Sequence, residues 1–111
     1  MTLFENTHGE RAAWQRRAGG ELAAILQTHR GLPIITWTVG SAGATLVGQV
    51  SGLAPAAEVR ATFEAWRAAL MLTERTEVAS RAGIVYLRSV ALRNRIQVGL
   101  TATVLNDEGE A

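Results

Sequence analysis

Apolar side chains recur at helical spacing in two stretches of the chain. The first set is Trp14, Ala18, Leu22, Ile25, Leu26 and His29. The second set is Val59, Phe63, Trp66 and Leu70. Steps of three and four residues place each set on one face of a helix, and we expect that face to pack against a sheet. Gly31 and Pro33 end the first helix, and Pro55 suits the start of the second.

Four other stretches alternate between apolar and polar positions, which is the pattern of a half-buried strand. They cover residues 34–39, 44–51, 84–91 and 96–104. The first two are joined by residues 40–43, Gly-Ser-Ala-Gly, whose length and composition suit a hairpin loop. The last two are joined by a turn at Arg93 and Asn94. We therefore predict two antiparallel hairpins.

Two further expectations concern these strands. Gly48 faces inward and leaves room for a bulky neighbour, for which Trp37 is the expected filler.

Residues 73–81 are polar, but residues 76–80 alternate with period two. Either a weak edge strand or a polar connection satisfies this pattern.

Together the elements predict an α+β fold of two layers, in the order α-β-β-α-(β)-β-β, with two helices on one face of an antiparallel sheet. A length of 111 residues suits one domain, which we place at residues 21–105. Residues 1–20 form a polar, Arg-bearing arm or frayed helix. Gly19 and Gly20 either break this arm from the next segment or mark a close packing contact. Residues 106–111 form a disordered acidic tail.

Composition excludes several classes of chemistry. Cysteine is absent, which excludes disulfides, thiolate nucleophiles and cysteine-held metals. All eleven basic residues are Arg, which excludes a Schiff-base lysine and the lysine of a Walker-type phosphate loop. His8 and His29 lack a convincing carboxylate partner, and the only Asp is Asp107 in the tail. We therefore expect no enzymatic activity, no catalytic or metal-binding residue and no cofactor.

The start of the chain bears on localisation. The first twenty residues lack the apolar core of a signal peptide. No run approaches the roughly 18 apolar residues that cross a bilayer. We expect a cytoplasmic protein without a membrane partner.

The arginines form two clusters along the chain. Net charge is +1, but residues 1–105 carry eleven Arg against seven Glu. One cluster lies in the arm and the other around the second hairpin turn, and the members are Arg11, Arg16, Arg17, Arg88, Arg93 and Arg95. They are the candidates for contact with an anion or with nucleic acid, against the alternative of an ordinary solvated surface. Trp14 stands alone in the polar arm, where it either anchors the arm or belongs to a subunit interface.

Three short runs carry a resemblance. Ile35-Thr36-Trp37-Thr38-Val39-Gly40, Leu46-Val47-Gly48 and Phe63-Glu64-Ala65-Trp66 resemble those of a recurrent group of small uncharacterised actinobacterial proteins, over about residues 22–104. This resemblance implies a shared architecture and brings no activity, ligand or catalytic residue with it. The order of elements also resembles that of Roadblock-type dimerisation domains, without their closing C-terminal helix.

These observations favour a non-enzymatic module for protein interaction or regulation that forms a homodimer, because symmetric association can complete a small core. The alternative is a nucleic-acid-binding accessory protein that uses the Arg-rich arm and hairpin. A protein with a small-molecule pocket between sheet and helices is a third hypothesis, which no residue supports.

Overall fold

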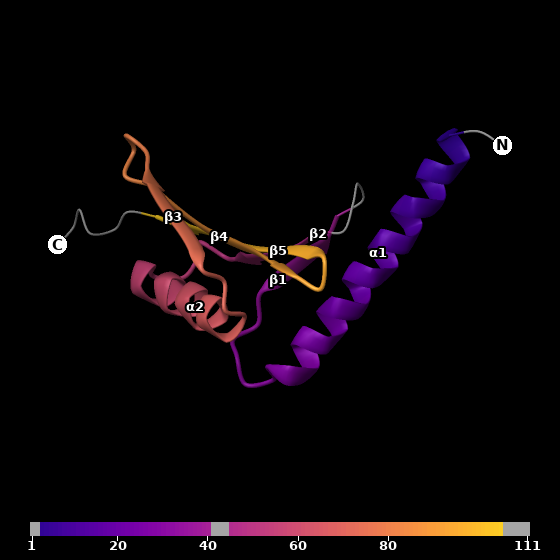
Figure 1. Ribbon diagram of the computed structural model, residues 1–111. Coiled ribbons are helices and arrows are strands. Elements are labelled where there is room, and N and C mark those ends of the chain that lie inside the picture. The colour runs from indigo at the N-terminus through magenta and orange to yellow at the C-terminus, as the bar shows by residue number, and fades with distance from the viewer. Residues whose placement is uncertain (1–2, 41–44, 106–111) are drawn as a thin grey trace.

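The computed structural model describes residues 3–40 and 45–105, so part of the expected loop at residues 40–43 and the expected tail lie outside the described residues. The elements in chain order are α1 (Leu3–Thr28), β1 (Thr36–Val39), β2 (Thr45–Val50), α2 (Ala56–Ala69), β3 (Glu74–Ala79), β4 (Val85–Arg93) and β5 (Ile96–Val104). The predicted α+β class is confirmed. Of the two alternatives for residues 73–81, the edge strand is the one that forms. Figure 1 shows the helices and the five-stranded sheet.

The strand order is β1-β2-β5-β4-β3. The β1/β2, β3/β4 and β4/β5 pairs are antiparallel, which confirms both predicted hairpins. The β2/β5 pair is parallel, so the prediction of an antiparallel sheet is wrong. A short turn forces antiparallel pairing only on strands that it joins directly. No turn joins β2 to β5, because α2, β3 and β4 lie between them in the chain.

The β4–β5 turn has two residues, Asn94 and Arg95, because Arg93 pairs with Ile96. Both turn residues have positive φ, 51° and 68°. This is the backbone of a type I′ turn, whose twist matches that of the flanking strands. Glycine is the usual residue at the second position, so Arg95 adopts a backbone conformation that few side chains prefer.

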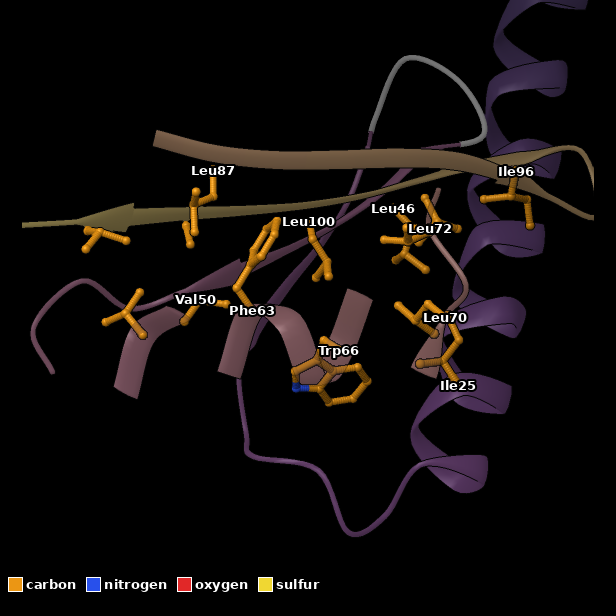
Figure 2. Close-up of a cluster of buried hydrophobic side chains, with 14 of the residues drawn as sticks. Ile25, Leu46, Val50, Phe63, Trp66, Leu70, Leu72, Leu87, Ile96 and Leu100 are labelled. Carbon is orange, nitrogen blue, oxygen red and sulfur yellow. The ribbon is translucent and has the colours of Figure 1, made fainter. Parts of the chain in front are cut away.

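One core joins both helices to one face of the sheet, as Figure 2 shows. Phe63 and Trp66 of α2 are buried against the sheet. The Trp66 Nε1–H donates a hydrogen bond to the Pro33 carbonyl at 2.7 Å, and Trp37 packs edge to face on Trp66 with ring centroids 5.6 Å apart. Gly48 lies opposite Trp37, and a Cβ there would come within 2.9 Å of the Trp37 ring. The expected role of Trp37 is confirmed.

Helix α1 runs unbroken through Gly19 and Gly20. Neither glycine would bring an added Cβ within 4 Å of another group, so the expected break and the expected close contact are both wrong. Ala18 and Ile25 are buried on either side, and these anchors hold the helix despite the glycines. The other end of α1 projects from the body (Figure 1). The radius of gyration is accordingly 16.2 Å, against about 13 Å for a compact domain of 100 residues.

Candidate functional site

The two faces of the sheet have different neighbours. Side chains alternate between faces along each strand, and one set packs under α1 and α2. Among the described residues no helix lies over the other face, as Figure 1 shows. We call this second set the open face; it comprises Thr36, Thr38, Thr45, Val47, Gln49, Glu74, Thr76, Val78, Tyr86, Arg88, Val90, Leu92, Gln97, Gly99, Thr101 and Thr103.

Side chains on the open face are mostly threonine or apolar. The large apolar side chains Val47, Val78, Tyr86 and Leu92 are exposed there, Leu92 to 73%. Arg88 is the one cation and Glu74 the one anion among these strand positions. Val78 pairs with Tyr86, so these two exposed apolar side chains are neighbours, and neighbouring apolar side chains on a nearly uncharged face are found at interaction sites.

A hollow of about 310 Å³ lies at the middle of the open face. Gly99 of the central strand β5 forms its floor between Val47 and Val90, and Arg88 and Gln97 lie at its sides. A Cβ at Gly99 would approach no group closer than 3.7 Å, and the glycine has no positive φ. The fold therefore does not require glycine at this position, and the missing side chain adds space to the hollow.

A network of charges occupies the contact between α2 and β3, on the helix side of the sheet. Glu64 pairs with Arg67 and Arg75, each at 2.7 Å, and Glu77 pairs with Arg60 at 3.4 Å and with Arg75 at 3.3 Å. A hydrogen bond from Arg67 and another from Arg75 lower the pKa of Glu64. The hydrogen bond from Arg60 likewise lowers the pKa of Glu77. These charges tie the edge strand to the helix and are not free for a partner.

The arginines predicted to cluster at the second hairpin lie in three different places. Arg88 is exposed on the open face. The Arg93 Nε donates to Glu21 of α1 at 3.1 Å, and its Nη1 donates to the Leu70 carbonyl at 3.4 Å. Arg95 is exposed in the turn. The structure does not bring these three side chains together.

The candidates in the predicted arm lie on the projecting part of α1. Arg11, Arg16 and Arg17 are all exposed. Successive helix residues point about 100° apart, so Arg16 and Arg17 face different directions. Trp14 is 37% exposed and lies one turn before the buried Ala18. These residues do not form one surface with Arg88.

Other candidate chemistry is sparse. His29 packs edge to face against Trp66, with ring centroids 6.3 Å apart. In the described part of the chain, no group of three His, Asp or Glu side chains is placed to hold a metal ion. Over residues 3–40 and 45–105, no helix has the length and apolar character needed to cross a membrane.

The fold and the surface define a two-layer α+β protein with one sheet face uncovered by helices in the described residues. No protein-family model, curated protein or solved structure matches the chain. The sequence did not predict the open face as a candidate site, and the arginine clusters were the candidates instead. The pattern that could have indicated it is a series of alternate strand positions occupied by Thr, Val or Gln and by few charges, as at Thr45, Val47 and Gln49.

Proposed function

We propose that this chain is a non-enzymatic module for protein interaction or regulation that works as a homodimer, with the open faces of two copies packed together. The observation that carries the proposal is the exposed, nearly uncharged surface around Val47, Tyr86 and Leu92. Face-to-face packing of two sheets is a common way to bury such a surface, with the sheets about 10 Å apart.

The size of the open face supports a modest, reversible dimer. Five strands about 4.8 Å apart, with about six residues each of 3.3 Å rise, span roughly 24 by 20 Å, or about 500 Å² before side-chain relief. Standard interfaces take about 800 Å² per partner, and small reversible ones take less. We therefore expect a reversible dimer and not an obligate one.

Charge favours a second copy over nucleic acid. The open face has one arginine and one glutamate, so its strand positions sum to zero charge. A surface of zero net charge matches its own copy, whereas a phosphate backbone attracts surfaces rich in Arg and Lys. The six candidate arginines are divided among α1, the open face, the end of β4, where Arg93 is paired with Glu21, and the β4–β5 turn, and so offer no continuous basic surface.

Analytical ultracentrifugation across the micromolar range tests the dimer. Wild-type protein should associate reversibly, and Val47→Glu should shift the equilibrium to monomer because it buries a charge in the interface. Leu53→Glu is the matched control, since Leu53 is 93% exposed in the β2–α2 connection, outside the strands that form the open face. Circular dichroism should show the same fold for all three proteins.

Two outcomes would overturn the proposal. The first is a wild-type protein that stays monomeric throughout the range. The second is binding of an oligonucleotide at low salt that fades with added salt and with Arg88→Ala, which would assign the open face to nucleic acid instead.

A further inference from the structure

The arrangement of side chains along β4 points to one orientation of the two copies. Tyr86, Arg88, Val90 and Leu92 follow one another on the open face. Tyr86 and Leu92 are each three residues from Ser89, and Arg88 and Val90 are each one residue from it. Glu74 of the neighbouring strand lies level with Val90.

We infer that the two-fold axis of the dimer lies between the two open faces, parallel to the sheets and perpendicular to the strands, at the level of Ser89 of β4; this inference rests on the proposed function. Such an axis places Tyr86 of each copy over Leu92 of the other. It also places Arg88 of each copy over Val90 of the other, beside Glu74 of that second copy. Apolar side chains then meet apolar ones, and each cation meets an anion, twice by symmetry.

Neither charge has an ion-pair partner among residues 3–40 and 45–105. Arg88 and Glu74 are both exposed. An axis moved by one residue to Arg88 would instead stack the two Arg88 side chains over each other, which like-charge repulsion opposes. Of these two positions, electrostatics therefore favours the one at Ser89.

Hollows on both sides of Val90 leave room for this arrangement. A long side chain such as Arg88 needs space when two sheet faces approach to about 10 Å. In the inferred orientation Arg88 of the second copy lies over Val90, which borders the hollow and is paired with Gly99. Glu74 lies on the opposite side of Val90, where a second hollow is lined by Glu74, Val90 and Leu92. This second hollow provides space for the guanidinium of that arginine beside Glu74.

Cross-linking tests the orientation directly, because the chain has no cysteine of its own. The protein is the variant Tyr86→Cys/Leu92→Cys, treated with a short bismaleimide. Within one chain the two positions are six residues apart on an extended strand, about 20 Å, which is too far for the reagent. Across the inferred interface they are about 10 Å apart. The single variants Tyr86→Cys and Leu92→Cys are the matched controls, because each cysteine lies about 20 Å from its own copy along the strand direction.

The expected result is a covalent dimer from the double variant and at least roughly tenfold less from either single variant. Equal cross-linking of the single variants would overturn the inferred axis while leaving the dimer intact. A double variant that sediments as a dimer and fails to cross-link would do the same. A wild-type protein that is monomeric by sedimentation removes both the inference and the proposed function.

A charge exchange provides a second measurement that needs no cysteine. Arg88→Glu alone and Glu74→Arg alone each place like charges together twice in the dimer, and should lower the association constant roughly tenfold or more. The double variant Arg88→Glu/Glu74→Arg restores the pairs, and its association constant should return to within about threefold of wild type. Equal association of all four proteins would contradict the inferred axis.

Discussion

The helix-covered face and the open face of the sheet come from the same five strands, yet they differ in composition and in packing. On the covered face, Leu46, Leu87 and Leu100 are essentially inaccessible to solvent. On the open face, Val47, Tyr86 and Leu92 keep a large part of their surface exposed. The first face is a closely packed core, and the second carries threonines and partly exposed apolar side chains. The difference teaches that the apolar content of a strand does not by itself identify the folding core.

Truncating one leucine of the covered face should give the largest difference in stability between the two faces. Leu100→Ala removes a fully buried side chain from the covered face and should lower the free energy of unfolding by about 2–5 kcal/mol. Val47→Ala on the open face should lower it by less than about 1 kcal/mol, because Val47 is 38% exposed. Urea unfolding at a dilute, monomeric concentration measures both. Equal losses would show that the two faces contribute alike to the fold.

Alanine substitutions of Gly48 and Gly99 compare the stability of the two faces a second time. Gly48→Ala should cost about 1–3 kcal/mol, because the new Cβ would lie 2.9 Å from both the Trp37 ring and the Ile35 methyl. Gly99→Ala should leave stability unchanged or raise it by up to about 1 kcal/mol, since the open face has room and alanine loses less backbone entropy on folding. Thermal unfolding monitored by circular dichroism compares them. A Gly99→Ala variant as unstable as Gly48→Ala would contradict the assignment of Gly99 to the partner surface.

Acid should weaken the contacts on the covered side of the sheet more than those on the open face. We expect its effect on stability to be smaller than that of the substitutions above. The folded protein lowers the pKa of Glu64 and Glu77. A lowered carboxyl pKa stabilises the fold fully above the unfolded value, near 4.5, and this contribution is lost as pH falls through the folded value. Unfolding of the monomer should therefore become easier below about pH 4.5.

Two substitutions test the source of that pH dependence. Glu64→Gln should flatten the dependence, because it removes a carboxylate held by Arg67 and Arg75. Glu74→Gln should leave it nearly unchanged, since Glu74 forms no ion pair with the described residues of its own chain. Urea titrations at several pH values measure both. A larger effect from Glu74→Gln would mean that the open face contributes more charge interaction to the monomer than the α2–β3 contact.

Local patterns were enough to predict most elements. The spacing of Val59, Phe63 and Trp66 predicted α2, and the pairing of Trp37 with Gly48 was predicted from the size of one side chain and the absence of another. The pattern failed at Gly19 and Gly20, where packing on both sides outweighed a helix cost of roughly 2 kcal/mol. The helical pattern also did not predict that the outward-facing charges of α2 form ion pairs with β3.

The candidate site was harder to predict, because it depends on contacts between distant segments. Arg93 was a candidate for anion contact, but its partner Glu21 is 72 residues away in the chain. Arg88 and Glu74 share the open face only because of the β3/β4 register, in which Thr76 lies opposite Arg88. A shift of one residue would move Glu74 to the covered face. No local pattern distinguishes these two registers.

By itself, the sequence determined the class of the fold, its two hairpins and the periodicities that give each element an apolar side, because these depend on neighbours a few residues apart. The tertiary structure alone decided that β5 returns beside β2 in parallel, and that the register of β3 on β4 puts Glu74 and Arg88 on the same face. Those choices depend on packing between segments far apart in the chain, and they left Tyr86, Arg88 and Leu92 on a surface that no described helix covers.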